Sequence, residues 1–403
     1  MSSPAPSPRL AVVVSHPIQY YSPWFRWLRA NAPLEFRVFY LWKFGIETTR
    51  DPRFGASFKW DVDLLEGYDS EFVPNVSRKP GAESFWGFNN PNLSSRLDAF
   101  RPDAVLLFGY KWVSHLRTVA WARRRRIPLI FRGDSHLLGR GTPGWPAYPL
   151  IRALYAQFAA FLYVGAANRD YFAAFGVKEK KLFFAPHSVD DRLFHSSELA
   201  RRAAAELRRQ LGLSPSATVV LFAGKLVAEK QPGELLAAFL ELRRPDASLV
   251  FVGDGTELVA LREASAAAPP GVVHFLPFAN QTEMPARYLL ADLLALPSRG
   301  FYETWGLAVN EAMNLGVPAL VSDRVGCQRD LVTEGETGWV FRTEDPINLR
   351  EQLGKALDAI RLPGARERLR AATISRVSSY SYARTTDGLM AALGSLRLRN
   401  RVI

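Results

Sequence analysis

The stretch ADLLALPSRGFYETWGLAVNEAMNLGVPALVSD, residues 291–323, contains two kinds of apolar pattern. The runs LLALPS (293–298) and PALVSD (318–323) are short and continuously apolar, which is typical of strands buried on both faces. Between them lies GLAVNEAMNLG (306–316), whose apolar residues recur at helical spacing. A strand, a helix and a second strand in this order predict a parallel β-α-β unit.

The same alternation extends outward from residues 291–323 over most of the chain. Amphipathic stretches such as VSHLRTVAWARRRR (113–126) separate further short apolar runs. We expect buried strands in the runs LAVVVSH (10–16), LEFRVFYLW (34–42), DAVLLFG (103–109), PLIFRG (128–133), AAFLYVG (159–165), TVVLFAG (218–224), SLVFVGD (248–254) and VVHFLP (272–277). This pattern predicts an α/β protein with two Rossmann-like, doubly wound parallel sheets, each covered by helices.

The break between the two expected sheets falls near residues 185–195. We therefore expect an N-terminal domain over residues 1–190, beginning with a disordered leader at 1–9, and a C-terminal domain over residues 191–378. Residues 379–403 contain a helical pattern with no strand after it. We expect this last helix to cross back and cover the N-terminal domain.

Composition excludes several classes of protein. The chain has 403 residues, 48% apolar and 22% charged, which suits a globular protein with large cores. Its one cysteine, Cys327, excludes a disulfide framework and a cysteine-rich zinc site. Residues 1–190 hold 25 Lys and Arg against 15 Asp and Glu, whereas residues 191–403 hold 26 against 24. Eight of the ten tryptophans precede residue 150. The two halves are therefore expected to meet different partners, with an anionic one on the first.

The most hydrophobic window is PLIRALYAQFAAFLYVGAA, residues 149–167. Because Arg152 interrupts it and it falls short of a bilayer's thickness, we expect a helix followed by a buried strand. The four arginines Arg123–Arg126 are either a solvated helix end or a contact for anionic lipid headgroups. We expect a cytoplasmic protein that visits the inner face of the membrane peripherally.

Two carboxylates follow the expected strand at residues 293–298. Glu303 lies just before the expected helix, and Glu311 lies eight residues further on. Eight helical residues turn through about 800°, roughly 80° beyond two full turns, so both carboxylates can face one side. The free amides of Thr304, Trp305, Gly306 and Leu307 form an anion site at the helix start, and Gly306 would let a phosphate approach closely. This arrangement suits a nucleotide diphosphate-sugar, with a diol at each end of the diphosphate.

Two lysines follow the expected strand at residues 218–224. Lys225 comes directly after the strand, and Lys230 opens the next helix. Two cations at one strand end suit a diphosphate leaving group, whose negative charge grows as its bond breaks. Alone, the pair would be indistinguishable from two solvated surface lysines.

Taken together, these segments resemble the donor domain of the family 4 glycosyltransferases, which have the GT-B fold. The matching pieces span roughly residues 190–375 and are, in order, GKLVAEK (224–230), LVFVGDG (249–255), VHFLPF (273–278), the stretch at 291–323 and DLVTEGETGWVF (330–341). The resemblance implies a retaining hexosyltransferase that needs no metal and no other cofactor. It implies that Glu311 binds ribose and Glu303 the donor sugar, while Lys225, Lys230 and the Thr304–Leu307 amides hold the diphosphate. The family more often has Arg at the position of Lys225.

The first half matches this family less closely. Its first loop is SHPIQYYSPWFRWL (15–28), where the family usually has a glycine-rich loop, and His16 ends the strand before it. Arg132 stands where the family often has its active-site histidine, so His136, His16 and Asp134 remain alternatives for that role. Arg132 and Tyr110 are candidates for facing an acceptor. His187 replaces an asparagine common in the family's turn, and we interpret it as structural.

The predicted function is therefore transfer of a sugar from a nucleotide diphosphate-sugar to a glycan or lipid-linked acceptor. The alternatives are a sugar-nucleotide epimerase of the same fold and, in another class, a basic nucleic-acid-binding protein. No basic-aromatic RNA module supports nucleic acid as a partner, and Gly253-Asp254-Gly255 lacks the rest of a dinucleotide fingerprint. Asp61-Val62-Asp63 matches a metal motif of another glycosyltransferase fold, but no buried strand leads into it, so we expect no metal there.

Overall fold

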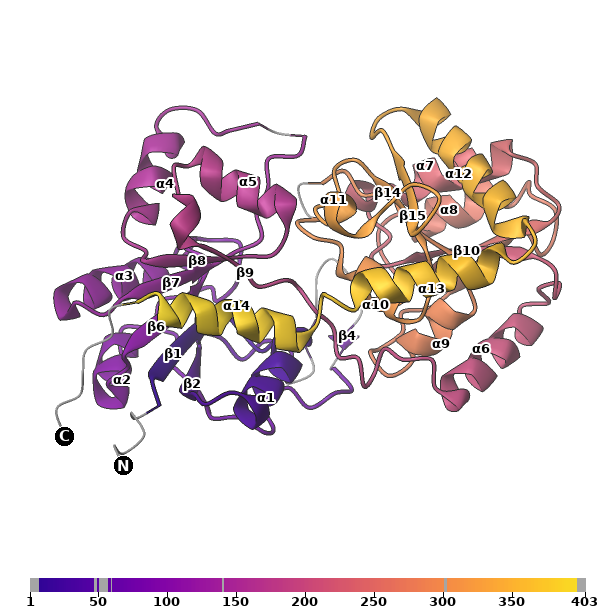
Figure 1. The fold of residues 1–403 in the computed structure, drawn as a ribbon. Helices are drawn as coiled ribbons and strands as arrows, with labels where there is room; N and C mark the ends of the chain where they lie inside the picture. The colour runs from indigo at the N-terminus through magenta and orange to yellow at the C-terminus, as the bar shows by residue number, and fades with distance from the viewer. Residues whose placement is uncertain are drawn as a thin grey trace.

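A computed structural model describes residues 7–46, 49–50, 57–58, 60–139, 141–300 and 303–396, with the backbone alone at 49–50 and 57–58. Two α/β domains lie side by side (Figure 1). Each is built on a parallel sheet. The expected pair of doubly wound domains is therefore confirmed.

The N-terminal sheet has, within the described residues, seven parallel strands in the order β5-β2-β1-β6-β7-β8-β9. Their bounds are β1 (Arg9–Val14), β2 (Glu35–Tyr40), β5 (Ser70–Phe72), β6 (Ala104–Phe108), β7 (Leu129–Arg132), β8 (Ala160–Tyr163) and β9 (Leu182–Phe184). A separate antiparallel pair joins β3 (Thr49–Arg50) and β4 (Ser57–Phe58). Because the seven strands are parallel, the loops after β1, β2, β6 and β7 all leave the same edge of the sheet.

Both faces of this sheet are buried, so its strands read as continuous apolar runs. Along β1, Ala11 and Val13 pack into the core on one face, while Leu10 and Val12 pack into the core on the other. Period-two alternation thus supplies two cores from one strand. The helices that complete these cores are α1 (Ser22–Asn31), α2 (Leu93–Phe100), α3 (Val113–Arg125), α4 (Ala147–Tyr155) and α5 (Ala166–Ala174), with a short turn η1 (Glu179–Lys181) before β9.

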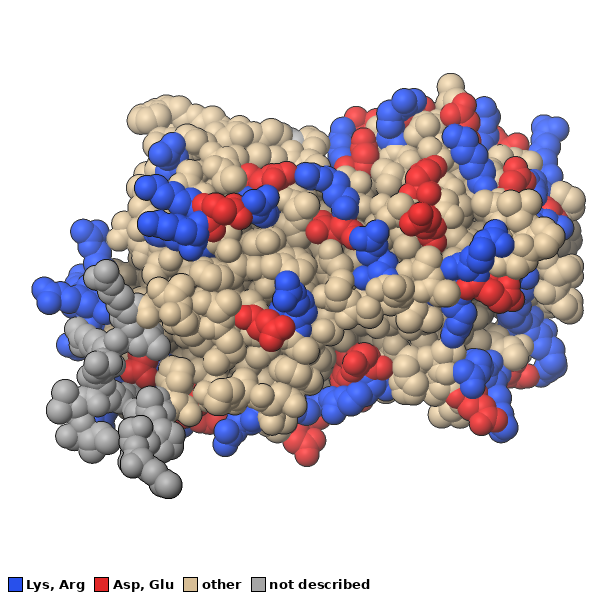
Figure 2. Space-filling view, in the orientation of Figure 1, with Lys and Arg blue, Asp and Glu red and all other residues tan. Residues whose placement is uncertain are grey.

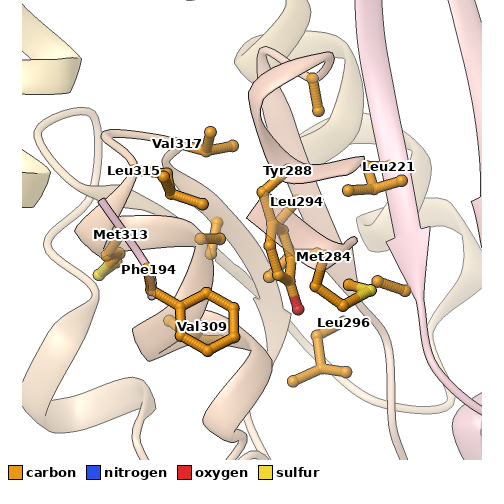
Figure 3. Packing of buried hydrophobic residues seen from close by; sticks show 14 of the residues in the cluster. Phe194, Leu221, Met284, Tyr288, Leu294, Leu296, Val309, Met313, Leu315 and Val317 are labelled. Atoms are coloured by element: carbon orange, nitrogen blue, oxygen red, sulfur yellow. The ribbon is translucent and has the colours of Figure 1, made fainter. Parts of the chain in front are cut away.

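The C-terminal sheet has six parallel strands among the described residues, in the order β12-β11-β10-β13-β14-β15. Their bounds are β10 (Thr218–Ala223), β11 (Ala247–Val252), β12 (Val273–Leu276), β13 (Leu293–Leu296), β14 (Ala319–Ser322) and β15 (Gly338–Phe341). The sheet's helices are α6 (Glu198–Gln210), η2 (Ala228–Lys230), α7 (Pro232–Glu241), α8 (Leu258–Ser265), α9 (Met284–Leu289), α10 (Leu307–Asn314), α11 (Gln328–Leu331), α12 (Pro346–Arg361) and α13 (Ala365–Val377). Figure 3 shows the core on one face, where Tyr288 of α9 packs beside Met284 and Leu294.

The chain returns to the N-terminal domain at its end. Helix α13 runs along the C-terminal domain, and α14 (Tyr382–Gly394) lies across β8, β9 and α1 (Figure 1). Trp24 Nε1 donates to Thr386 Oγ1 at 3.0 Å, which fixes α14 against α1. Gly388 allows the close contact with β9, because a Cβ there would lie 2.0 Å from the carbonyl oxygen of Phe184.

The expected strands and chain ends agree with the structure in most places and differ in a few. All ten expected strands are present, and the 149–167 window forms α4 and β8. The pattern missed β5, β9 and β15, which are short strands at sheet edges, and the two-residue strands β3 and β4. The expected leader ends too late, because Arg9 opens β1 and its N–H donates to Asp103 at 2.8 Å. Residues 1–6 and 397–403 lie outside the described part. No helix among the described residues is long and apolar enough to span a membrane.

Charge is distributed differently over the two domains. On the face shown in Figure 2, Lys and Arg gather at the outer end of the N-terminal domain, near α3, whereas both signs alternate over the C-terminal domain. The side chains of Arg123–Arg126 are exposed at the end of α3, and Arg125 pairs with Asp98 at 2.9 Å. The excess positive charge of the first half is therefore partly a surface feature of α3.

Candidate active site

A cavity of about 780 Å³ lies between the two domains. Its walls come from the loops that follow β1, β2, β4, β7 and β9 on one side and β10, β11, β12 and β13 on the other. The carboxyl edges of the two sheets therefore face each other across this cavity, which is where open α/β sheets bind their ligands. Every predicted donor-side residue lines it: Lys225, Lys230, Glu303, Thr304, Trp305, Gly306, Leu307 and Glu311.

The start of α10 gives the cavity its anion site. The carbonyl groups of Glu303 and Trp305 accept hydrogen bonds from the amides of Gly326 and Cys327, at 3.3 and 2.8 Å, which hold this loop in place. Within the described residues, no acceptor pairs with the amides of Thr304–Leu307. These amides stand at the positive end of the helix dipole and can donate to an anion.

Gly306 is needed at this helix start for a reason other than the one expected. Its φ is 101°, a left-handed conformation that disfavours other residues. A Cβ at Gly306 would lie 2.8 Å from Val325 and 3.1 Å from Leu296, in the core rather than at the cavity. The glycine therefore permits the turn and the packing beneath it.

Lys230 and Glu303 form an ion pair in the cavity wall. Lys230 ends η2, and its ammonium contacts the Glu303 carboxylate. Ser298 Oγ also donates to Glu303, at 3.0 Å. The amide of Arg299 donates to the carbonyl of Glu229 at 2.9 Å and so ties the loop after β13 to the turn after β10. Two chain segments that are distant in sequence thus hold the cation and the carboxylate side by side.

The Gly253-Asp254-Gly255 sequence packs the loop after β11 against the loop after β10. A Cβ at Gly253 would lie 2.0 Å from the carbonyl oxygen of Gly224, and one at Gly255 would lie 2.3 Å from that of Leu226. These glycines therefore allow two backbones to touch beside Lys225. This packing role accounts for them without a dinucleotide loop.

Glu311 is buried and fully engaged. Tyr288 Oη donates to one carboxylate oxygen at 2.6 Å, and Tyr20 Oη, from the N-terminal domain, donates to the other at 3.0 Å. Burial raises the pKa of Glu311 to about 7, although both hydroxyl donors act in the opposite direction. A carboxylate that accepts from two hydroxyls has the geometry to bind a vicinal diol.

Asp134 of the N-terminal domain contacts the C-terminal wall of the cavity. Thr304 Oγ1 donates to Asp134 Oδ2 at 2.9 Å, and His187 Nε2 lies 3.4 Å from the same oxygen. Burial alone would raise the pKa of Asp134, but His187 and Thr304 outweigh it and hold the pKa below its usual value. Burial also lowers the pKa of His187. His187, interpreted from sequence as structural, therefore lines the cavity beside Asp134.

His136 and His16 occupy different environments. The Leu138 amide donates to His136 Nδ1 at 3.1 Å, which leaves the ring proton on Nε2, 3.3 Å from the Glu303 carbonyl oxygen. Nδ1 of His136 thus fixes the ring against its own loop, and Nε2 contacts the Glu303 loop. The residues that line the cavity do not include His16. Its ring packs edge-on against Trp42 and Phe44, and burial lowers its pKa to about 4.

Arg132 and Tyr110, the candidates for facing an acceptor, also lie outside the cavity lining. Arg132 is buried, with its guanidinium donating to the Ala185 carbonyl at 2.9 Å and lying over the ring of Trp24. Tyr110 packs against Phe131 and Tyr155. Their contacts stabilise the N-terminal domain, and neither points into the cavity.

The Asp61 and Asp63 pair is explained by local hydrogen bonds. Asp61 accepts from Thr282 of the C-terminal domain, with the Thr282 amide at 3.1 Å. Asp63 accepts from the amides of Leu65 and Glu66 at 2.8 and 3.0 Å, as in an aspartate-capped turn. No cluster of metal-ligating side chains occurs in the part of the chain that the structure describes.

Sequence reasoning missed several residues of the site. Tyr20, Phe44 and Trp60 line the cavity from the N-terminal domain, and Gln281 and Tyr288 line it from the C-terminal domain. Tyr20 lies in the first loop, whose position after β1 was a usable signal. The other four lie in loops or a helix without a motif, so only the fold could identify them.

The comparisons with known proteins agree with this geometry. A family model described as glycosyl transferases group 1 matches residues 204–376. The D-inositol 3-phosphate glycosyltransferase of Rhodococcus jostii is 34% identical over 374 residues, which cover 83% of this chain and 78% of that protein. The enzyme of the same name from Nocardia farcinica is 31% identical over 229 residues, covering 54% of this chain and 48% of that protein. In the Nocardia case, the match spans about half the relative's length.

The fold comparison covers nearly the whole chain. The crystal structure of HepE from Anabaena, in complex with UDP and glucose, superposes with a TM-score of 0.71 at 17% identity. The match covers 96% of this chain and 100% of that one. At this identity the similarity shows the shared fold, two facing Rossmann-like domains of the GT-B type.

Proposed function

The chain belongs to the group 1 glycosyltransferases, and from that premise we propose that it transfers a sugar from a nucleotide diphosphate-sugar to an acceptor hydroxyl with retention of configuration. One observation supports this most strongly. A single cavity brings together Glu303, Glu311, Lys225, Lys230 and the amides of 304–307. These are the charges and donors that a diphosphate flanked by two polyols requires.

The donor would lie along the C-terminal wall. The diphosphate would accept hydrogen bonds from the α10 amides and pair with Lys225 and Lys230. Glu311 would take the ribose diol in place of one or both tyrosine hydroxyls, and Glu303 would accept from hydroxyls of the donor sugar. Each contact matches a negative group to a donor, or a hydroxyl to a carboxylate.

In the proposed reaction, the bond between the anomeric carbon and the diphosphate oxygen breaks, and the electron pair leaves with the diphosphate. Lys225, Lys230 and the α10 amides stabilise the growing negative charge, because they are oriented before the reaction begins. The acceptor oxygen then bonds to the anomeric carbon on the face the diphosphate left. Its proton passes to a diphosphate oxygen, and the products are the glycoside and a nucleoside diphosphate. The two lysines and the amides would serve where other transferases use a divalent metal.

The acceptor would approach from the N-terminal wall of the cavity. A glycan or a lipid-linked sugar is the class we propose for it. The exposed arginines at the end of α3 would support a peripheral contact with the inner face of an anionic membrane. The nucleotide base and the donor sugar are identified by the two experiments described next.

Thermal shift with UDP, GDP, ADP and NAD tests the donor side directly. A ligand at about 100 times its Kd stabilises the folded state by about 2.7 kcal/mol. We expect at least one nucleoside diphosphate to raise Tm and NAD to leave it unchanged. A donor-hydrolysis screen over nucleotide sugars then identifies the sugar. Stabilisation by NAD alone, with no nucleotide sugar hydrolysed, would refute the proposal.

A further inference from the structure

The tryptophans of the first half are not all core residues. Trp24 and Trp121 are buried in the N-terminal cores. Four others lie in loops at the carboxyl edge of the N-terminal sheet, or in loops that contact this edge. With two phenylalanines they form a set that we name the aromatic rim: Trp42, Phe44, Trp60, Phe85, Trp86 and Trp112.

The inner end of the aromatic rim belongs to the cavity itself. Phe44 and Trp60 line the cavity from the N-terminal side. Gly45 makes room for the Trp60 indole, since a Cβ there would lie 3.3 Å from it. Trp42 stacks on Phe44 with ring centroids 4.6 Å apart and planes inclined by 23°. The stacked rings therefore begin at the wall of the cavity.

The aromatic rim continues away from the cavity across the loops after β2, β5 and β6. The buried ring of Phe88 joins Trp42, at 5.7 Å, to Trp112, at 4.3 Å. The Val113 amide donates to the Phe85 carbonyl at 3.0 Å, which attaches the 82–86 loop to this edge. At the outer end, Phe85 and Trp86 are 39% and 58% exposed. Large apolar side chains with this exposure indicate a contact surface.

Charges beside the aromatic rim are mostly positive. Lys43 follows Trp42, and Lys111 precedes Trp112; both lysines are exposed. Arg78, Lys79 and Glu83 are exposed in the loop that carries Phe85 and Trp86, and Asp61 is an exposed acidic residue next to Trp60. Among the described residues, these exposed charges are therefore four basic residues against two acidic ones. Aromatic faces stack on the apolar faces of sugar rings, and ammonium groups pair with carboxylate or phosphate substituents.

We propose that the aromatic rim binds the acceptor, and that the acceptor is an oligosaccharide of two or more rings bearing a negative charge. The inference rests on the proposed function, because it makes the rim the path by which an acceptor hydroxyl reaches the donor. A carbohydrate chain fits this surface better than a bilayer does. A flat membrane could touch Phe85 and Trp86, but it could not reach Phe44 and Trp60 inside the cavity.

The test uses the double variant Phe85→Ala/Trp86→Ala, whose side chains are exposed enough to be removed without a cavity in the core. Trp145→Ala is the matched control, because Trp145 is 86% exposed and lies outside the aromatic rim. Each protein is applied to an array of neutral and anionic oligosaccharides of one to six rings. Stabilisation by UDP, or by whichever nucleoside diphosphate binds the wild type, reports the donor side separately.

We expect the wild type to bind anionic oligosaccharides more tightly as rings are added. The double variant should lose about tenfold or more in affinity for the longer chains. Trp145→Ala should bind them as the wild type does, and the nucleoside diphosphate shift should persist in all three proteins. Array binding that is absent, or equal in the double variant, overturns the inference while leaving the donor assignment intact.

A second experiment tests whether the aromatic rim binds a membrane instead of an oligosaccharide. Flotation with phosphatidylglycerol vesicles is measured for the same three proteins. Vesicle binding that the double variant loses, without any oligosaccharide binding by the wild type, would make the aromatic rim a membrane surface and overturn the inference. If instead no nucleoside diphosphate binds but the rim still binds oligosaccharides, the proposed function fails and the glycan site remains.

Discussion

The two walls of the cleft differ in chemistry. The C-terminal wall presents charged groups, namely Lys230 paired with Glu303, Lys225, and the buried Glu311. The N-terminal wall presents mainly rings, with Phe44 and Trp60 lining the cavity and Asp134 as its carboxylate. Fixed charges suit a ligand whose diphosphate and ribose do not vary. Aromatic faces suit the sugar rings of the acceptor proposed above.

The walls are also joined to each other by hydrogen bonds. Tyr20 donates to Glu311 at 3.0 Å, and Thr304 donates to Asp134 at 2.9 Å. Asp61 of the N-terminal domain also accepts from Thr282 of the C-terminal domain. A ligand that binds Glu311 must therefore compete with a residue of the opposite domain. Donor binding and the relative position of the walls should be coupled through Tyr20.

The largest expected effect on turnover comes from removing a charge on the C-terminal wall. Lys230→Ala and Glu311→Ala should each lower turnover about 100-fold or more, as loss of one preoriented charge contact does. Turnover of the nucleotide sugar found by the hydrolysis screen is the measurement. Lys180→Ala and Glu351→Gln, at exposed positions outside the cavity, are the matched controls. Folded variants of both site residues with near wild-type turnover would refute the donor assignment.

A smaller effect should follow from the protonation of Glu311. Its pKa of about 7 lies above the usual 4.5, so the fraction that is ionised falls as pH drops through 7. A protonated carboxyl accepts from a diol less well, so affinity for the nucleoside diphosphate should weaken below pH 7, by at most about tenfold per unit. Titration calorimetry at pH 6 and pH 8 measures this difference.

The variant Tyr288→Phe tests the same dependence of affinity on the protonation of Glu311. It removes a hydroxyl whose donation lowers the pKa of Glu311, so the midpoint of the affinity profile should move to higher pH. Tyr163→Phe, which removes a hydroxyl outside the cavity, should leave the midpoint in place. An affinity profile that is flat between pH 6 and pH 8 in the wild type would contradict the role of Glu311.

A modest effect is expected at the membrane. Arg123→Gln/Arg124→Gln should reduce flotation with anionic vesicles several-fold, since each basic residue near such a surface contributes about 1 kcal/mol. Arg201→Gln/Arg202→Gln on α6 is the control with the same change of charge on the other domain. Wild-type binding should also weaken in 1 M salt, where the Debye length falls to about 3 Å. Equal flotation with neutral vesicles would leave the α3 arginines as solvated surface.

The smallest expected effect is that of metal removal. EDTA should leave turnover unchanged, because Lys225, Lys230 and the α10 amides would already neutralise the diphosphate. Activity lost to EDTA and restored by Mn²⁺ or Mg²⁺ would contradict this. In that case Asp61 would be a candidate metal ligand, and the metal would have to displace its contact with Thr282.

Prediction from the sequence succeeded where the information is local. Glu303 and Glu311 lie on one strand-loop-helix segment, so helical geometry alone brings both to the same wall. Lys225 and Lys230 follow a strand whose carboxyl end is fixed by the parallel pattern. By contrast, the sequence could not show whether Arg132 faces the cavity or the domain core. Arg132 ends β7 and its side chain is buried, whereas Asp134, two residues later, lines the cavity.

The sequence by itself determined the α/β class, the two domains, the return of the last helix and the residues that gather at the C-terminal wall of the cavity. It could do so because hydrophobic periodicity and strand ends are encoded over short stretches. Only the tertiary structure decided the other wall. Tyr20 and Glu311 are 291 residues apart, and their contact exists because two separately encoded sheets face each other. The aromatic rim likewise collects residues from four loops, those after β2, β4, β5 and β6, which no periodicity in the chain relates to one another.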